Sequence, residues 1–358
     1  MTTSLDRVIL SAALIGACLI PASAMAQSAA DFYKGKELIL NIGSGVGGGY
    51  DTYTRALARH WGRYIPGNPT IVVKNMPGAS GTTMMNHLAV RAKTDGTEIG
   101  APFGQSLIEP VFDKGAVTKY DSRTMNWIGN ISSQSIACFT WKTRSEVKTI
   151  EDAMVKTAIM GATGANNPSA IYTNVFNMLM GTKFKVITGY TTAESTLSIE
   201  RGETDGTCLS FATLIVAHPQ WIEQDKLNWL AVVANKPDPN LPGVPTTARF
   251  LRTDEDKQVV DVLISQLVMG RPYVAPPGVP ADRLAALRAS FQEVMKDQTF
   301  LAEAKKQYIV VTPATHTEME KLIADTYALP DRIIEKAVAL LKGAEAMGEN
   351  AEKIKAAQ

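Results

Sequence analysis

A glycine-rich segment near the start of the chain is the first place where residue spacing could support chemistry. Its sequence, GSGVGG at 43–48, follows a strand-like run and precedes a helix-like one. This arrangement formally matches the G-x-G-x-x-G dinucleotide fingerprint. The next strand, however, ends at Lys74-Asn75, where that fingerprint needs an acidic residue for the ribose. No Gly-Lys-Ser/Thr follows the glycines either, so neither a dinucleotide site nor a phosphate-binding P-loop is favoured.

The glycines still allow the backbone to approach a small anion closely. Main-chain N–H groups at the N-terminus of a helix bind a carboxylate without any arginine. Two further loops rich in Gly, Ser, Thr and Asn resemble the first, and the three cover residues 43–51, 77–83 and 161–169. Because loops at the carboxyl ends of parallel strands line ligand sites, the set predicts polar capture of a small anion. A tight strand-to-helix turn that serves packing alone is the alternative for the first loop.

Residues that could catalyse a reaction or hold a metal are scattered along the sequence. The four histidines, at positions 60, 87, 218 and 316, form none of the H-x-x-x-H or H-E-x-x-H spacings of zinc sites. No G-x-S-x-G nucleophile elbow is present. Asp51 could act as an acid, but capping its helix or accepting hydrogen bonds from a ligand or water fits better. We therefore expect a protein that is not an enzyme and uses no metal and no cofactor.

The elements that must position these loops alternate between strands and helices. In the first part of the chain we expect strands at Glu37–Ile42, 70–74 and Glu98–Ala101, and helices at 51–64 and 82–92. A similar series then restarts, with strands at 135–141, 158–160, 184–187 and Gly206–Ser210, and helices at 149–155, 170–180 and 191–201. Such alternation with short glycine-rich turns predicts an α/β protein with two lobes, each a mostly parallel sheet flanked by helices.

The later part of the chain adds a strand at 267–274 and helices at 281–296, 299–307 and 316–342. We expect the chain to cross between the lobes near Ile131 and again after Thr247. Domain 1 is then discontinuous, formed by residues 27–131 plus about 248–358, and domain 2 covers residues 132–247.

The first 26 residues are typical of a secretory signal peptide. Arg7 precedes an apolar run at 8–20, and Ala24-Met25-Ala26 forms an A-x-A cleavage pattern. The run of thirteen residues is too short to span a bilayer, which needs about 20. Cys18 weakly resembles a lipoprotein cleavage site, but apolar residues follow it in place of a polar linker. We therefore expect cleavage near Ala26 and a soluble mature protein that works outside the cytoplasm.

Composition limits the partners of the chain. The 36 basic and 35 acidic residues nearly cancel, and no long basic run is present, so a nucleic acid or an anionic membrane is not supported. About 330 residues remain after the signal peptide, which suits two domains. Two cysteines remain as well, Cys138 and Cys208. They could pair in an oxidising compartment, and two buried free thiols are an equal alternative.

Several segments together resemble the extracytoplasmic receptors of tripartite tricarboxylate transporters, the Bug family of periplasmic solute-binding proteins. These segments are GGGYD at 47–51, VKNMPGASG at 73–81, DGT at 95–97, RGETDG at 201–206 and VAPPGVP at 274–280. Their order and spacing hold from about residue 31 to residue 342, so the set is far more specific than any one motif. The resemblance implies a periplasmic-binding-protein fold, type II-like, with two lobes, a hinge and a ligand cleft between the lobes.

The resemblance also implies a ligand site and partners. Members of this family typically hold a ligand carboxylate through backbone N–H groups, hydroxyls and bridging waters. Carried over by position, the first-lobe contacts are Gly48, Gly49, Tyr50, Asp51, Ser80, Thr82, Gln105 and Ser106. The second-lobe contacts are Thr163, Asn166, Asn167, Ser169, Tyr190, Thr192, Ser210 and Phe211. The implied ligand is a small di-, tri- or aromatic carboxylate, which a monomer delivers to the membrane permease subunits of such a transporter.

The chain departs from the usual family pattern at Tyr50, in the loop around Asn166 and at Thr191. These positions belong to the implied pocket, so citrate or an acidic amino acid is not assumed as the ligand. Two other functions stay open at this point. One is a ligand-sensing protein that signals to a membrane receptor. The other is a periplasmic enzyme acting on a carboxylate, against which the missing nucleophile–base pair argues.

Overall fold

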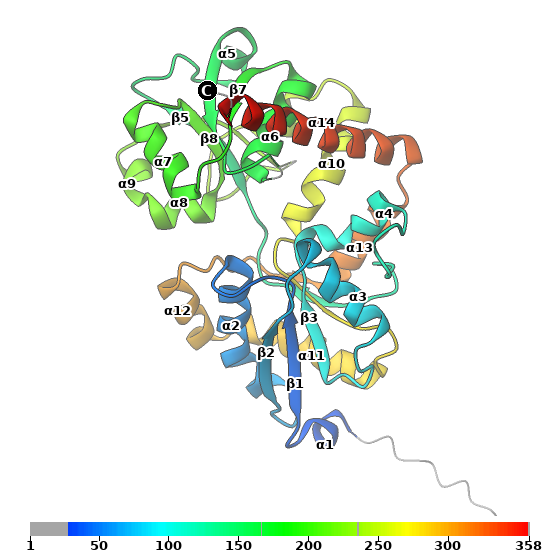
Figure 1. Cartoon of the computed structure of the whole chain (residues 1–358). Helices are drawn as coiled ribbons and strands as arrows, with labels where there is room; N and C mark the ends of the chain where they lie inside the picture. The colour runs from blue at the N-terminus through cyan, green and yellow to red at the C-terminus, as the bar shows by residue number, and fades with distance from the viewer. Residues whose placement is uncertain (1–27, 166, 235, 357–358) are drawn as a thin grey trace, which may run out of the picture.

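The computed structural model describes residues 28–165, 167–234 and 236–356. In these ranges the chain forms two lobes, each built on one β-sheet with helices around it (Figure 1). No helix within them is long and apolar enough to cross a membrane. The predicted signal peptide, residues 1–26, lies outside the described residues.

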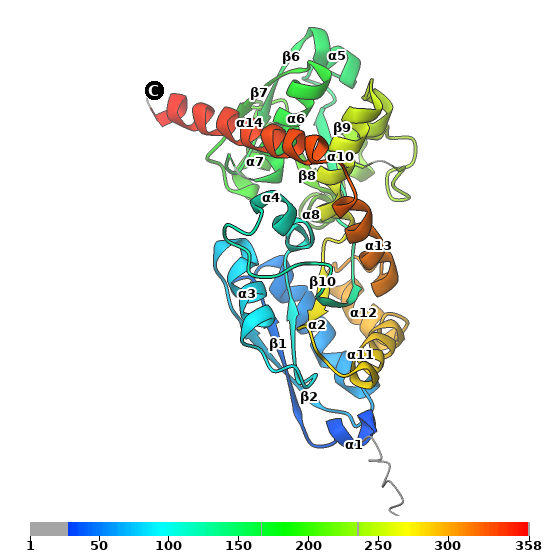
Figure 2. The same ribbon diagram turned by 90° about the vertical axis from the view of Figure 1, so that its right-hand side faces the viewer.

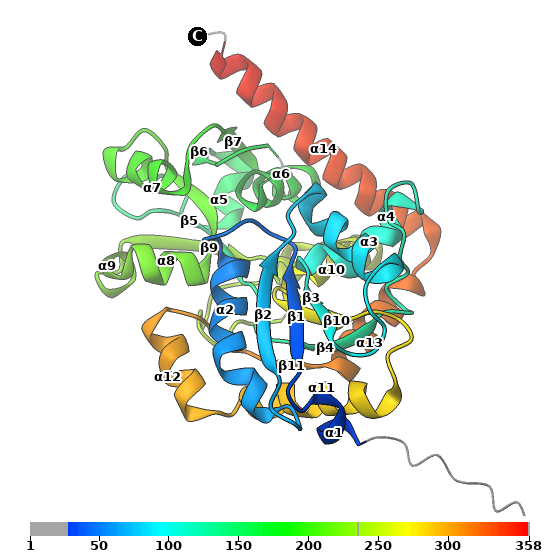
Figure 3. The ribbon, with the colours of Figure 1, turned by 60° about the horizontal axis from the view of Figure 1, so that its bottom comes forward.

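The first lobe is built on a sheet with the strand order β11-β4-β10-β3-β1-β2, seen face-on in Figure 3. Its strands are β1 (Glu37–Ile42), β2 (Thr70–Asn75), β3 (Glu98–Ala101), β4 (Asn126–Asn130), β10 (Pro272–Ala275) and β11 (Ala314–Thr315). Leu38, Leu40 and Ile42 alternate along β1 and are fully buried, as expected for side chains on the core face of a strand.

The second lobe is built on a sheet with the order β7-β6-β8-β5-β9. Its strands are β5 (Ile136–Trp141), β6 (Thr157–Gly161), β7 (Lys183–Ile187), β8 (Gly206–Ser210) and β9 (Leu227–Val232). Cys138 of β5 and Cys208 of β8 lie directly opposite each other in the antiparallel register, and a disulfide joins them. The pair therefore links two strands of one lobe and not the two lobes.

Both sheets are mixed, whereas we predicted mostly parallel ones. In the first sheet β1 pairs in parallel with β2 and β3, but β10 runs antiparallel to β3 and β4. In the second, β6 pairs in parallel with β7 and β8, but β5 runs antiparallel to β8 and β9. The cause is the crossing of the chain between lobes, because β5 and β10 each begin at a crossing while their neighbours run toward it. The carboxyl ends of β1, β2, β3, β6, β7 and β8 consequently all face the side where the lobes join.

Helices surround both sheets. Those of the first lobe are α1 (Ala29–Tyr33), α2 (Gly49–Trp61), α3 (Thr82–Val90), α4 (Glu109–Asp113), α11 (Ala281–Val294), α12 (Gln298–Lys306) and α13 (His316–Tyr327). Those on the second lobe are α5 (Ile150–Val155), α6 (Pro168–Met180), α7 (Thr192–Arg201), α8 (Phe211–Ala217), α9 (Pro219–Glu223), α10 (Asp254–Val268) and α14 (Asp331–Ala356). In the first core the ring of Trp61 packs edge-on against Tyr273 and Phe291, with centroids 5.9 and 5.5 Å away.

Local sequence explains where many of these helices begin and end. The side chains of Asn167, Thr191 and Thr253 accept hydrogen bonds from backbone N–H groups in the first turns of α6, α7 and α10. Gly181 and Gly202 end α6 and α7 in the left-handed conformation, with φ of 70° and 79°. The loops that precede α6 and α7 are therefore held in place by the helices themselves.

Helices α10 and α14 come late in the sequence but pack on the second lobe. Val260, Ile264 and Leu267 of α10 belong to the second-lobe core, and α14 lies along α6 (Figure 2). The predicted strand at 267–274 is wrong in its first half, since Leu267 and Val268 end α10. The predicted helix at 316–342 is divided, because the chain leaves α13 before Pro330 and starts α14 after it. We keep as a proposal the division into domain 1 (27–131 plus about 248–358) and domain 2 (132–247). In this division α10 and α14 belong to domain 1 by their place in the sequence, although both helices pack on the second lobe.

Two chain segments run side by side where the lobes join, at residues 130–135 and 267–271. The Gln134 N–H donates to the Leu267 carbonyl oxygen (2.7 Å), and the Ile131 N–H donates to the Arg271 carbonyl oxygen (3.0 Å). The Arg271 N–H in turn donates to Oδ1 of Asn130 (2.8 Å). We call these paired segments the hinge.

Candidate functional site

The loop before α2 is held in shape by Asp51. Its carboxylate accepts hydrogen bonds from the Gly47 N–H (2.9 Å), from Asn75 Nδ2 (2.9 Å) and from Arg55 Nε (2.8 Å). The Asn75 side chain also donates to the Ser44 carbonyl oxygen, at 2.9 Å. Since Asp51 is 4% exposed and its oxygens already have partners, its part in the site is to fix the glycine loop.

The pKa of Asp51 agrees with this assignment. Burial acts to raise the pKa of the carboxyl, but the hydrogen bonds from Gly47, Asn75 and Arg55 outweigh it and hold the pKa below its ordinary value. The group is therefore charged at neutral pH. A charged carboxylate with three donors is poorly suited to give a proton to a substrate, so the catalytic interpretation of Asp51 loses support.

Tyr50 and Gly49, both predicted contacts, meet a residue that sequence analysis missed. The Arg271 guanidinium carbon lies 4.0 Å from the centroid of the Tyr50 ring. A Cβ on Gly49 would lie 3.1 Å from Nη2 of Arg271, so a side chain at this position would press on the guanidinium. The other side of the tyrosine meets Phe103, with ring centroids 4.3 Å apart, and its hydroxyl accepts from the Gly104 N–H.

Two of the other predicted contacts in the first lobe, Thr82 and Ser106, are buried. The hydroxyl of Thr82 donates to Glu109 (2.8 Å), and Ser106 is fully buried with its carbonyl oxygen bonded to Tyr120. Burial raises the pKa of Glu109. Gln105 lies in the short turn Gly104–Leu107. The side chain of Ser80 lies outside the described part of the chain.

A cavity of about 220 Å³ opens on the second lobe, and nine of its thirteen lining residues are Ser, Thr, Asn or Gln, so we call it the polar cavity. Four of the predicted contacts line it: Thr163, Asn167, Ser169 and Ser210. Sequence analysis missed the other lining residues, which are Gln134, Ile136, Pro168, Ser195, Thr196, Thr207, Cys208, Leu209 and Thr213. Neither set contains a charged side chain, so the cavity offers hydroxyls, amides and backbone groups.

Two hydroxyls in this cavity are buried without a partner in the described ranges, Thr163 Oγ1 and Ser195 Oγ. Ser195, 4% exposed, lies in the first turn of α7, and Ser169 lies in the first turn of α6. The N-termini of these helices carry partial positive charge and free N–H groups. Because buried polar groups are normally satisfied, these two unpaired hydroxyls are candidates for hydrogen bonds to a bound polar group.

Not all second-lobe predictions gather at this cavity. Tyr190 and Phe211 are not among its lining residues. The Tyr190 N–H donates to the Ala162 carbonyl oxygen, and burial raises the pKa of its hydroxyl. Phe211 packs against Trp229, with ring centroids 6.2 Å apart. Asn166 and the side chain of Thr192 lie outside the described residues.

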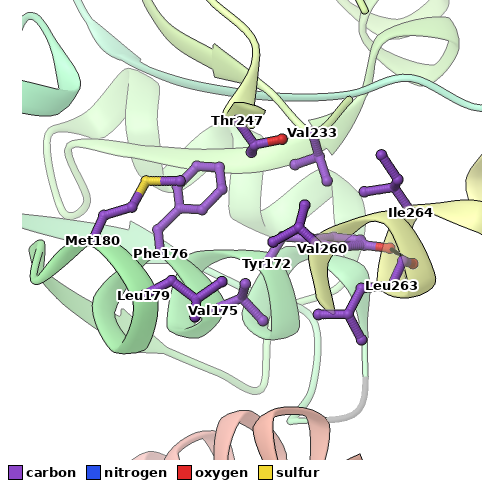
Figure 4. Close-up of a pocket in the computed structure, with 10 residues that line it drawn as sticks. All are labelled: Tyr172, Val175, Phe176, Leu179, Met180, Val233, Thr247, Val260, Leu263 and Ile264. Carbon is purple, nitrogen blue, oxygen red and sulfur yellow. Dashed lines mark hydrogen bonds between the residues drawn. The ribbon is translucent and has the colours of Figure 1, made fainter. Parts of the chain in front are cut away.

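Two other cavities differ in kind from the polar one. A void of about 10 Å³ lies in the second-lobe core, lined almost entirely by apolar side chains such as Phe176 and Leu263 (Figure 4). It is at the lower limit for one water and lacks polar partners. A groove of about 320 Å³ lies between Ile215 of α8 and α12, and its lining is mostly aliphatic. Among the described residues no group of His, Cys, Asp or Glu is arranged to hold a metal ion.

The family described as tripartite tricarboxylate transporter family receptor matches residues 63–339. The chain belongs to this family. The predicted resemblance is thereby confirmed, while a comparison with curated protein sequences found no match.

Solved structures of this family and of similar receptors share the fold. A TctC solute-binding protein from Polaromonas is 20% identical, with a TM-score of 0.67 over 85% of this chain and 99% of that one. MatC from Rhodopseudomonas palustris, solved with bound malate, is 14% identical, with a TM-score of 0.53 over 85% and 99%. An R. palustris protein solved with adipate is 15% identical, with a TM-score of 0.55 over 86% and 97%. These likenesses confirm the two-lobed periplasmic-binding-protein fold.

Proposed function

We propose that this receptor captures a small organic carboxylate in the periplasm and delivers it to the membrane permease of a tripartite tricarboxylate-type transporter. Membership of the receptor family supports the transport role. In this proposal residues 1–26 direct export, the mature chain acts as a monomer, and it catalyses no reaction. Similar structures contain malate and adipate, so we propose that dicarboxylates come first among di-, tri- and aromatic carboxylates.

The polar cavity of the second lobe carries the proposal. It joins unpaired buried hydroxyls to the first turns of two helices, and none of its lining residues bears a negative charge. An anion in such a place accepts hydrogen bonds from oriented donors and is favoured by the helix dipoles. Around an apolar ligand these donors would have no hydrogen-bond partner, and each would cost about 1–3 kcal/mol.

We propose capture by closure of the lobes. The ligand enters the open cleft and one carboxylate meets the loop before α2, which Asp51 keeps rigid. Rotation about the hinge then brings the cavity of the second lobe onto the ligand. Closure excludes water and strengthens the charge-assisted hydrogen bonds. A micromolar dissociation constant, about −8 kcal/mol, would be ordinary for such a site.

A thermal-shift screen of di-, tri- and aromatic carboxylates tests this function. Because a ligand that binds only the folded state raises its stability, a ligand at about 100 times its dissociation constant adds about 2.7 kcal/mol. We expect at least one carboxylate to raise the melting temperature by several degrees and its neutral amide analogue to have no effect. If no carboxylate stabilises the protein, or if the amides act equally well, the proposed function is wrong.

A further inference from the structure

Arg271 occupies a central place in the molecule. It lies in the second hinge segment, between the end of α10 and the start of β10. Its backbone N–H and carbonyl oxygen bond to Asn130 and Ile131 of the other segment. Its side chain reaches the first turn of α2, where Nη2 lies 3.1 Å from the position of a Cβ on Gly49. The guanidinium is thus fixed between the hinge and the glycine loop.

The guanidinium is stacked rather than ion-paired. Its carbon lies 4.0 Å from the ring centroid of Tyr50 and 5.0 Å from that of Tyr53. Stacking on an aromatic face fixes the plane of a guanidinium and leaves its N–H edge available for a carboxylate.

The charge of Arg271 has no acidic partner among the described residues. Nη1 donates to the Gly270 carbonyl oxygen at 2.7 Å, while Nε is buried and unpaired there. Arg55, on the next turn of α2, differs, because Asp51 and Asn75 accept its hydrogen bonds. A partly buried cation that lacks a counter-ion is costly unless an anion joins it. Beside the same loop, the charge of Arg55 is therefore neutralised by Asp51, whereas the charge of Arg271 is not neutralised; we call the latter the open charge.

The open charge is connected to the polar cavity through the hinge. Gly270 packs on Gln134, where a Cβ would lie 2.6 Å from Cγ of the glutamine and 3.1 Å from its backbone nitrogen. Gln134 is in turn a lining residue of the second-lobe cavity. The residue that precedes Arg271 thus contacts a residue that lines the cavity.

We propose that Arg271 is the cationic anchor of the ligand and restricts the receptor to anionic ligands. This inference rests on the proposed function and adds a residue that binds the carboxylate directly. The guanidinium receives a carboxylate through its remaining terminal N–H groups, beside the first turn of α2. The uncharged cavity then takes the opposite end of the ligand through hydroxyls. Arginine in place of backbone donors alone makes the affinity depend on the charge of the ligand and on salt.

The test titrates a carboxylate and its neutral amide into the full mature protein by calorimetry, at low and high salt. The titrant is malate, adipate or the carboxylate that stabilises the protein most in the thermal screen. The variants are Arg271→Gln, Arg271→Lys and, as a matched control, Arg59→Gln. Arg59 lies on the same helix as Tyr50 but bonds to Glu303 on α12. Thermal unfolding of each variant checks that it is folded.

We expect Arg271→Gln to weaken carboxylate binding roughly 10- to 100-fold, the range for one lost hydrogen-bonded charge. Its preference for the carboxylate over the amide and its salt dependence should fall as well, which a merely structural side chain would not cause. Arg271→Lys should recover part of the affinity and of the charge preference, and it replaces the glutamine variant if that one does not fold. The control should bind as the wild type does.

The outcomes separate the two claims. If the wild type binds no carboxylate, the proposed function fails and the role of Arg271 fails with it. If the wild type binds a carboxylate but the folded Arg271 variants bind it within twofold and keep its preference over the amide, the function stands and the role of Arg271 is overturned.

Discussion

Ser195 carries a buried hydroxyl without a hydrogen-bond partner among the described residues, and a bound ligand would offset the free-energy cost of burying it. Its hydroxyl is buried without a partner in the described part of the chain, beside the backbone of Gly161, where a Cβ would lie 3.0 Å from it. Removal of an unsatisfied buried hydroxyl is close to neutral or stabilising. We therefore predict that Ser195→Ala leaves the melting temperature of the free protein unchanged or raised, and weakens carboxylate binding about 3- to 30-fold.

Calorimetry and thermal unfolding of the same samples check this prediction. Ser198→Ala is the matched control, because the Ser198 hydroxyl bonds to Thr204 and to the Ser195 carbonyl oxygen within the protein. The control should lower the melting temperature and leave the affinity alone. A Ser195 variant that is less stable but binds normally would show that this hydroxyl belongs to the packing of α7 only.

The sequence predicted several residues of the candidate site because they lie in or beside loops rich in Gly, Ser, Thr and Asn. Thr163 and Ser169 come after β6 and Ser210 ends β8, and the structure places all three around one cavity. Ser195 was missed although the Thr191–Glu194 capping pattern marks the start of its helix. Arg271 was missed for a physical reason, since its role depends on a hinge segment that meets α2 from a distant part of the chain.

Helix α14 is the element that supports the second-lobe loop from behind. Its later turns lie beyond residue 339, where the family match ends, and they pack on α6. Asn174 of α6 donates to the Ala344 carbonyl oxygen at 2.9 Å. A Cβ on Gly348 would lie 2.7 Å from Cα of Ala165, which belongs to the loop at 161–169. The glycine thus allows α14 to touch this loop directly.

We predict that Gly348→Ala displaces this loop and weakens carboxylate binding several-fold. The gain in helix propensity, about 1 kcal/mol, offsets the steric cost, so the melting temperature should change little. Gly343→Ala is the control on the same helix, because its Cβ would meet only the flexible end of Met178, which can move aside. Equal affinities of the two variants in calorimetric titration would contradict a supporting role for this turn of α14.

The contact between α2 and α12 predicts a response to acid. The hydrogen bond from Arg59, together with that from His60, lowers the pKa of Glu303 from 4.5 to about 2 despite partial burial. A carboxyl with a lowered folded-state pKa stabilises the protein above its unfolded pKa and loses that effect as the pH falls through the folded one. Glu303→Gln should therefore be less stable than the wild type at pH 7, and the difference should vanish between pH 4.5 and about 2.

Urea unfolding at pH 7, 4.5 and 3 measures this difference. Glu293→Gln serves as the comparison, since its pair with Lys296 is exposed on both sides and should contribute less than about 1 kcal/mol. A constant gap between wild type and Glu303→Gln at all three pH values would rule out the charged carboxylate as its cause.

At the scale of elements, the sequence predicted most strands and helices but placed Leu267 and Val268 in a strand, because an apolar run alone does not distinguish a strand from the buried end of a helix.

The whole molecule consists of two lobes joined by the hinge, with the polar cavity on the second lobe. The loops that follow the parallel strands face the side where the lobes join, because these strands run toward the hinge. The alternation of strands and helices in the sequence predicted parallel sheets but not this orientation of their loops. We propose that one carboxylate ligand bridges the lobes, with Arg271 and the loop before α2 on one side and the polar cavity, which includes Ser195, on the other.

A crystal structure of the mature protein with its most stabilising carboxylate tests this central claim most directly. We predict closed lobes around a single ligand, with one carboxylate on the Arg271 guanidinium and the opposite end in contact with Thr163 and Ser195. A ligand that contacts one lobe only, or that lies in the groove beside α12, would contradict the account.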